Sequence, residues 1–189
     1  RFSQPVSTFR ASVNYNDPYL SQQWGATTVN LPAFWAIDAN ANNVLGRRPV
    51  VAILDTGVDI EHPDLKDNIW TNEKEANGVT GEDDDLNGYV DDLHGWDCVN
   101  QSGRLGDWNG HGTHCAGIAA AVANNGVGIV GANPDALIMA VTVLQSDGIG
   151  DVGTIIRGLE YCLTHDVDVI SMSLGSYAYS KAEELALGK

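Results

Sequence analysis

The chain has 189 residues, which is long enough for one domain with a hydrophobic core. Hydrophobic residues make up 43% of it and charged residues 19%, a balance that excludes disorder throughout the chain. The formal net charge of −15 argues against nucleic acid as a partner, because an acidic surface repels phosphates.

The sequence also limits two structural features, membrane-spanning helices and disulfides. No segment approaches the roughly 18 consecutive apolar residues of a membrane-spanning helix, so we expect no membrane span. The three cysteines Cys98, Cys115 and Cys162 are an odd number, so at least one of them is unpaired within the chain. A Cys98–Cys162 disulfide and three free thiols both fit this count. Cys115 is expected to be a small buried hydrophobic residue.

The first part of the chain predicts an arm, a helix and a buried strand. Residues 1–15 show no periodicity and are expected to form an extended arm, with a single domain over residues 16–189. A short helix is predicted over Leu31–Asp38, opened by a proline. The continuous apolar run at 50–54 is typical of a strand buried on both faces. Residues 67 to about 95 form an acidic insert, and a loop of that length is usually functional.

The second part alternates helices and strands. Helical spacing of apolar or small residues predicts helices over 111–123, 151–165 and 181–187. Apolar runs predict strands over 136–144 and 167–174. Strand–helix–strand alternation at these lengths implies an α/β fold, a three-layer sandwich with a parallel, doubly wound sheet.

Two residues stand where such a fold places its chemistry. Asp55 follows the first strand directly, and ligands of open α/β sheets bind outside the carboxyl ends of the strands. The alternative is a turn aspartate that caps the next segment. His111 opens a predicted helix, where the helix dipole helps to keep a general base neutral. His114 is expected to turn into the helix packing.

Longer motifs surround both residues. The segment VAILDTGVD at 51–59, followed by HPDL at 62–65, resembles the catalytic-aspartate segment of the subtilisin-like serine proteases. The segment HGTHCAG at 111–117 resembles the catalytic-histidine segment of that family, and SMSLG at 171–175 is similar to its substrate-binding strand. The order and spacing also fit, and the resemblance extends over residues 16–175.

The resemblance implies a secreted or secretory-pathway serine endopeptidase of the subtilisin type. Asp55 would orient His111, and His111 would take the proton of a serine nucleophile. A peptide or protein substrate would add as a strand along one edge of the cleft and face a glycine-rich edge. The substrate-binding residues implied are Ser173, Leu174 and Gly175 on the first edge and Gly148, Ile149 and Gly150 on the second. An ordinary glycine turn is the alternative for the second edge.

The sequence departs from the family at the nucleophile. The family's serine lies in a Gly-Thr-Ser-Met-Ala-like segment, which does not occur in the 189 residues. The sequence thus corresponds to a truncated domain, about two thirds of the catalytic unit, and we expect no peptide hydrolysis from it alone. A pro-region or a C-terminal remainder carrying the serine is an implied partner. The alternative function is a non-catalytic pseudoprotease or truncated isoform that binds peptide or calcium.

An acidic run within the insert predicts a calcium site. Residues 83–92 carry oxygen-bearing side chains at positions one, three and five and a glycine at six, as a calcium loop of the EF-hand type does. His94 replaces the glutamate of position twelve, so a complete EF-hand is not expected. A solvated acidic loop is the alternative. The predicted ligands of Ca²⁺ are the side chains of Asp83, Asp85, Asn87 and Asp92 and the carbonyl of Tyr89.

A second calcium site is implied only by the resemblance. The segment NNGVGI at 124–129 is similar to the strong calcium loop of the family, and Asp17 resembles an N-terminal ligand of one of its branches. An Asn-Gly turn with an unrelated aspartate is the alternative. The implied ligands are the side chains of Asp17, Asp64 and Asn125 and the carbonyls of Val122, Val127 and Ile129.

Overall fold

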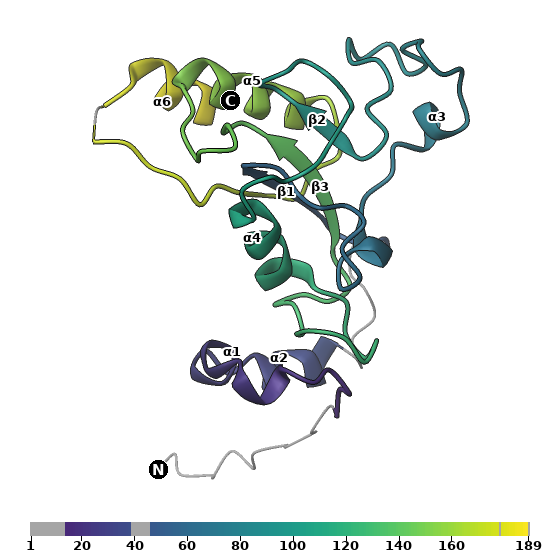
Figure 1. The fold of residues 1–189 in the computed structure, drawn as a ribbon, viewed down its shortest axis with the longest axis vertical. Helices are drawn as coiled ribbons and strands as arrows, with labels where there is room; N and C mark the ends of the chain where they lie inside the picture. The colour runs from purple at the N-terminus through teal and green to yellow at the C-terminus, as the bar shows by residue number, and fades with distance from the viewer. Residues whose placement is uncertain (1–13, 39–45, 178, 189) are drawn as a thin grey trace, which may run out of the picture.

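The computed structural model describes residues 14–38, 46–177 and 179–188 (Figure 1). The extended arm expected over residues 1–15 lies outside the described residues, apart from its last two positions. The described chain forms a parallel sheet with helices packed on both faces, which confirms the predicted α/β class.

Four strands form this sheet in the order β2-β3-β1-β4, and every neighbouring pair is parallel. Their bounds are Val50–Asp55 for β1, Gly95–Asp97 for β2, Leu137–Thr142 for β3 and Val169–Ser171 for β4. β1 and β3 lie in the middle of the sheet and are buried along nearly their whole length, as their continuous apolar runs predict. Asp55 pairs with Thr142 in the register, so both central strands end at one edge of the sheet.

Alternate residues of β1 pack in opposite directions, because successive side chains of a strand point to opposite faces. Ala52 and Leu54 lie in a core that includes residues of α5 (Val152–Leu163). Ile53 lies in a second core that includes alanines of α4 (His111–Ala120). The two helices therefore cover opposite faces of the sheet, as Figure 1 shows.

Four helices lie where the sequence predicts them. They are α2 (Leu31–Asp38), α4, α5 and α6 (Lys181–Leu187). α4 ends three residues before its predicted end, because the backbone becomes extended at Ala121 and the N–H of Val122 donates to the carbonyl of Asp64 at 2.9 Å. α5 begins with a capping box, in which the side chains of Asp151 and Thr154 satisfy each other's backbone N–H groups.

Shorter elements escaped the sequence patterns, since a turn of three to five residues shows no periodicity. They are the helical turns at Leu20–Gln22 and Lys66–Asn68, α1 (Trp24–Thr28), α3 (Glu73–Ala76) and the strand β2. Gly95 opens β2 with φ +132°, and a Cβ there would collide with the carbonyl oxygen of Ala140, so the approach of β2 to β3 requires glycine.

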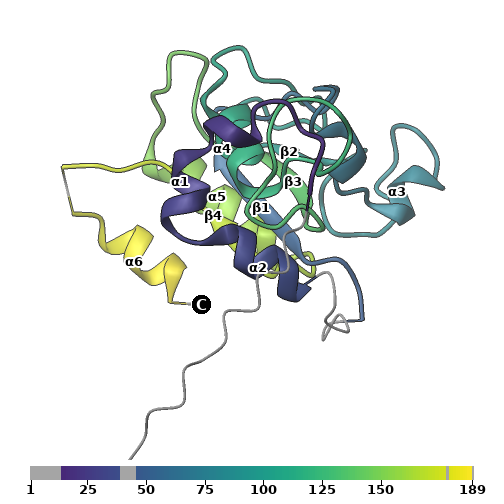
Figure 2. The same ribbon diagram turned by 90° about the horizontal axis from the view of Figure 1, so that it is seen from below.

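The outer helices lie at separate places around the sheet. Figure 1 shows α1 and α2 together at the end of the molecule away from α5, and Figure 2 shows α6 to one side of the sheet. Trp35 of α2 is anchored there by its indole N–H, which donates to the carbonyl of Ala132 at 3.0 Å. Among the described helices, none is long and apolar enough to cross a membrane.

Candidate active site

Asp55 and His111 meet at the end of β1. Asp55 is the last residue of that strand and is 0% exposed, and His111 is the first residue of α4. The Nδ1 of His111 lies 2.7 Å from Oδ1 of Asp55. The hydrogen bond and the charge of Asp55 raise the pKa of His111 above its ordinary value. The His111 side chain is 47% exposed, and His111 also lines the cleft described below.

Two glycines allow the strand end and the helix start to come this close. Gly57 has φ +113°, which favours glycine, and a Cβ there would collide with the carbonyl oxygen of Gly106. Gly112 has no room for a Cβ either, because the carbonyl oxygen of Gly57 occupies that space. The glycines of the two motifs are thus explained by the close packing that brings Asp55 to His111.

The first N–H groups of α4 are satisfied by side chains that the sequence analysis did not single out. The carboxylate of Asp107 accepts the N–H of Thr113 at 2.9 Å and its hydroxyl at 2.6 Å. The hydroxyl of Thr56 accepts the N–H of Gly112 at 3.0 Å and donates to Oδ1 of Asp107 at 2.9 Å. Asn109 accepts the N–H of His111 at 3.3 Å.

Asp107 is held as a carboxylate by these contacts. Burial raises its pKa, but hydrogen bonds from Thr113 and from the backbone N–H groups of Gly110 and Asn109 outweigh burial and leave the pKa below its ordinary value. A polar residue just before a predicted helix is the signal that could have found it, although here Gly110, in a left-handed conformation, occupies the cap position itself.

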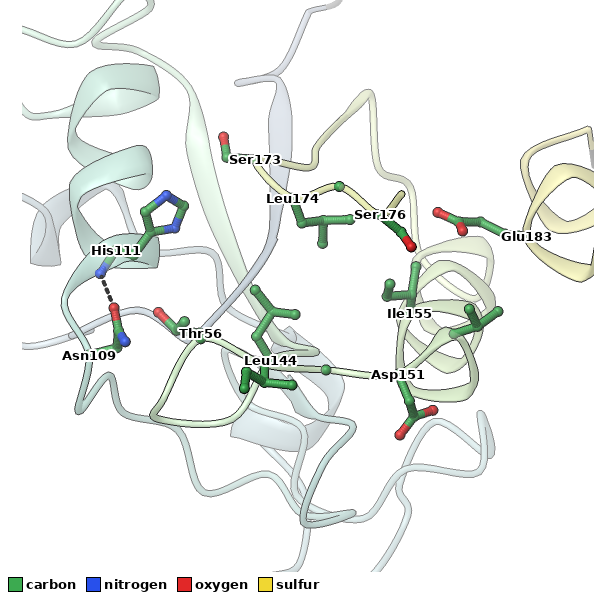
Figure 3. A pocket seen from close by; sticks show the side chains of 15 residues that line it. Thr56, Asn109, His111, Leu144, Asp151, Ile155, Ser173, Leu174, Ser176 and Glu183 are labelled. Carbon is green, nitrogen blue, oxygen red and sulfur yellow. Dashed lines mark hydrogen bonds between the residues drawn. The ribbon is translucent and has the colours of Figure 1, made fainter. Parts of the chain in front are cut away.

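A cleft of about 700 Å³ opens beside His111 (Figure 3). All six residues predicted to bind substrate line it. One wall is the segment Ser173–Gly175, and the other runs from Gly148 to Gly150. The apolar side chains of Leu144 and Ile155 lie between them, and Leu174 of the first wall adds a third apolar side chain. The structure therefore brings the predicted substrate residues and the histidine into one depression.

Two expectations about α4 need correction. His114 is exposed and does not turn into the helix packing. The buried face of α4 is formed by Gly112, Ala116, Gly117 and Ala120, and His114 lies about half a turn away from it. Cys115 is half-buried rather than buried, and its Sγ lies 4.0 Å from Nδ1 of His111.

The other two cysteines lie in the core. Cys98 and Cys162 are buried in the cluster of residues between the sheet and α5, and all three cysteines are free thiols in this structure. Of the two cysteine arrangements left open by the sequence, the structure has the one without a disulfide.

The residues of the N-terminal calcium prediction lie together. Asp64 is buried and accepts the side-chain amide of Asn125 at 2.8 Å and the N–H of Ile129 at 2.9 Å. Asp17 is also buried, and its Oδ2 accepts the N–H of Asn124 at 2.8 Å. Its Oδ1 is buried without a hydrogen-bond partner among the described residues.

The predicted carbonyl ligands belong to the same loop. Those of Val122, Val127 and Ile129 receive no hydrogen bond from the part of the chain that the structure describes. A buried carboxylate oxygen without a donor is costly unless something else satisfies it. Oδ1 of Asp17 and these carbonyls are oxygen atoms of the kind that a hard cation such as Ca²⁺ prefers, whereas the oxygens of Asp64 and Oδ1 of Asn125 accept hydrogen bonds in this structure.

The acidic insert groups its residues differently from the prediction. Asp83 turns back onto its own loop and accepts the N–H groups of Asn87 at 3.1 Å and Gly88 at 2.8 Å. Asp85 and Asp92 instead approach Glu75 of α3, and one carboxylate oxygen of each lies within 4.8 Å of the others.

Glu75 was missed, because three residues after Asn72 it resembles the ordinary second partner of a helix capping box. Its carboxylate instead accepts the N–H groups of Asp84, Asp85 and Asp91.

The remaining residues of the insert prediction join it to α5. The side-chain amide of Asn87 donates to Oδ2 of Asp92 at 3.1 Å, and the hydroxyl of Tyr161 donates to the same oxygen at 2.9 Å. The N–H of Tyr89 donates to Asn87 at 2.7 Å, and the Tyr89 ring packs edge-on against Trp96 and Tyr161. Asp92 and the Tyr89 ring thus join the insert to the core, whereas most residues of the insert between 73 and 91 are exposed.

The sequence of the chain is similar to those of known proteases. The model of the subtilase family matches residues 46–187. Subtilisin-like protease 1 of Plasmodium berghei is 36% identical over 166 residues, which cover 88% of this chain and 27% of that protein. Thermitase of Thermoactinomyces vulgaris is 40% identical over 161 residues, or 85% of this chain and 47% of that protein.

Intracellular proteins are also similar to the chain. The major intracellular serine protease of Bacillus subtilis is 40% identical over 152 residues, which cover 80% of this chain and 40% of that protein. The chain thus spans about a quarter of the length of the Plasmodium relative and less than half of the bacterial ones.

Proposed function

Because this chain belongs to the subtilase family, peptidase family S8, we propose that it carries two members of an Asp–His–Ser triad that hydrolyses peptide bonds. The observation that carries the proposal is the 2.7 Å contact between Nδ1 of His111 and the buried carboxylate of Asp55. The related proteases from Plasmodium and Thermoactinomyces support it.

The proposed chemistry follows from this contact. Asp55 accepts a hydrogen bond from Nδ1–H of His111, which keeps the proton on Nδ1 and leaves Nε2 free to act as the general base. Nε2 takes the proton of a serine hydroxyl as that oxygen attacks the peptide carbonyl, and later donates a proton to the leaving amine. Asp55 stabilises the imidazolium between these steps. No stretch of the 189 residues matches the nucleophile segment of the family, so the serine is proposed to come from outside them.

The substrate is proposed to lie in the cleft as an extended peptide. Backbone groups of Ser173–Gly175 would pair with it as a neighbouring strand does, and Gly148–Gly150 would face it from the other wall. This arrangement presents the scissile bond to His111 at one end of the cleft.

Calcium is proposed as a structural cation in two places. Asp17, Asp64, Asn125 and the carbonyls of the 122–129 loop would hold one ion, as the unpartnered Oδ1 of Asp17 suggests. Such an ion would fasten the segment around Asp17 to the loop after α4. Glu75, Asp85 and Asp92 would hold a second, since three carboxylates so close repel one another without a counter-ion.

Location is a separate part of the proposal. A secreted or secretory-pathway protein is proposed by family resemblance, although the relatives also include an intracellular serine protease. Immunodetection in fractionated source cells and culture medium tests it, and a purely cytosolic signal would contradict it.

Hydrolysis is tested by comparing the chain with the longer protein that contains it. We expect the longer protein to cleave a fluorogenic peptide, and His111→Ala to reduce kcat/KM by more than about a thousand-fold. The 189-residue chain alone should show no turnover. Activity unchanged in His111→Ala would refute the proposed base. A folded longer protein without any turnover would favour the peptide- or calcium-binding alternative.

A further inference from the structure

The cleft ends at α6, away from His111. Figure 3 shows His111 at one end of the cleft and Glu183 of α6 at the other, with the carboxylate of Glu183 directed inward past Ser176. Ile155 and Leu174 lie between the two ends and form an aliphatic surface next to Glu183. This end of the cleft therefore combines an apolar floor with one acidic group.

Glu183 is the acidic group that remains available there. Asp151 also lines the cleft, but its carboxylate accepts the N–H of Thr154 at 3.0 Å to cap α5 and points away from the depression in Figure 3. Glu183 as a residue is half-buried, and its carboxylate has no hydrogen bond or ion pair with any described residue. Its neighbour Glu184, by contrast, is bound by Lys181 and the hydroxyl of Tyr179.

No positive charge balances this group locally. Neither lysine nor arginine is among the described residues that line the cleft, and the chain as a whole carries a formal charge of −15. A carboxylate inside a cleft is screened less than one on the open surface, so a cationic ligand gains more by reaching it.

We infer that Glu183 determines specificity, selecting peptides with a lysine or arginine side chain at a position removed from the scissile bond. The aliphatic stem of such a side chain would pack on Ile155 and Leu174, and its charged head would pair with the Glu183 carboxylate. Acidic side chains are repelled at the same place. The inference rests on the proposed function of the cleft, since it requires that a peptide lies between the two walls.

Binding of labelled peptides to the 189-residue chain tests the inference without requiring turnover. The peptides have one length and are otherwise uncharged, and each carries a single lysine whose position moves stepwise along the sequence. Each is matched by a version with norleucine in place of lysine. Fluorescence anisotropy gives the dissociation constants. At one register, lysine should bind about five- to tenfold more tightly than norleucine. Glu183→Gln should remove this difference, and Glu183→Lys should reverse it in favour of a glutamate peptide.

Glu184→Gln is the matched control, because it removes the neighbouring charge from the same helix and should leave the lysine preference unchanged. Equal binding of lysine and norleucine peptides at every register, or a preference that survives Glu183→Gln, would overturn the inference while leaving the cleft as a peptide site. Failure of every peptide to bind would overturn both the peptide site and the inference.

Discussion

Thr56 and Asp107 are joined by a 2.9 Å hydrogen bond from the Thr56 hydroxyl to the Asp107 carboxylate. Thr56 directly follows Asp55 at the end of β1, and the Asp107 carboxylate binds Thr113 in the first turn of α4. The pair therefore ties the strand that carries Asp55 to the helix that carries His111. The geometry of the proposed dyad depends on a contact that does not include either of its members.

Asp107→Ala should destabilise the fold and loosen the dyad. It leaves the N–H of Thr113 without its acceptor, and the loss of such a helix-capping carboxylate costs about 1–2 kcal/mol. The free energy of unfolding from urea titration measures this. The control is Asp67→Ala, because Asp67 is exposed and its carboxylate makes no hydrogen bond with the described residues. This control should change the free energy of unfolding by less than about 0.5 kcal/mol.

The same carboxylate predicts a dependence on pH. Because the pKa of Asp107 is lowered in the fold, its stabilising effect is present above the unfolded value of about 3.9 and is lost as the pH falls through the folded value. Asp107→Asn should therefore flatten part of the stability curve at acidic pH. Identical acid unfolding curves for the variant and the parent would contradict this role.

His111 should titrate above its ordinary pKa, because the Asp55 carboxylate stabilises the imidazolium. The ion pair contributes stability that is fully present below about pH 6.5 and is lost as the pH rises through the raised pKa. The base, in contrast, becomes available only as the pH rises through that value. NMR titration of the ring protons measures the pKa, and Asp55→Asn should lower it. An unchanged titration in Asp55→Asn would show that Asp55 does not set it.

The sequence predicted the central elements because their patterns are long. β1 and β3 are continuous apolar runs, and α5 repeats its apolar residues over three turns, so the pattern of apolar residues alone identifies these elements. β2 has three residues and depends on pairing with β3, which no local pattern reveals. The end of α4 was predicted too late because a tertiary hydrogen bond to Asp64 draws the chain away.

The site was predicted unevenly for a related reason. Asp55 and His111 lie inside long motifs, whereas Asp107, Glu75 and Glu183 take their places from contacts between segments far apart in the chain. Glu75 lies eight residues before the acidic run that suggested calcium, and its proximity to Asp92 is visible only in the fold. A single sequence without its contacts gives no reason to group these residues.

Calcium should stabilise the chain through the site around Asp64. After treatment with excess chelator, addition of millimolar Ca²⁺ should raise the Tm. An ion present at 100 times its Kd adds about 2.7 kcal/mol to the free energy of unfolding. Asp17→Asn should weaken the response, because it removes the charge of the carboxylate whose Oδ1 has no other partner. Asp67→Asn, at an exposed position, should retain it. A Tm that does not differ between chelator and calcium in the parent chain would refute both proposed cation sites.

Cys115 should be the one cysteine that reacts rapidly in the folded chain. Burial raises the pKa of Cys98 and Cys162 to about 12 each, so neither carries an appreciable thiolate fraction at pH 8, and both are shielded in the core. Cys115 is half-buried and sits beside His111. A chromogenic disulfide reagent should therefore titrate one thiol per folded chain and three after denaturation. Cys115→Ser should abolish the reaction of the folded chain. If only one thiol appeared after denaturation without reductant, Cys98 and Cys162 would be disulfide-bonded, contrary to the structure.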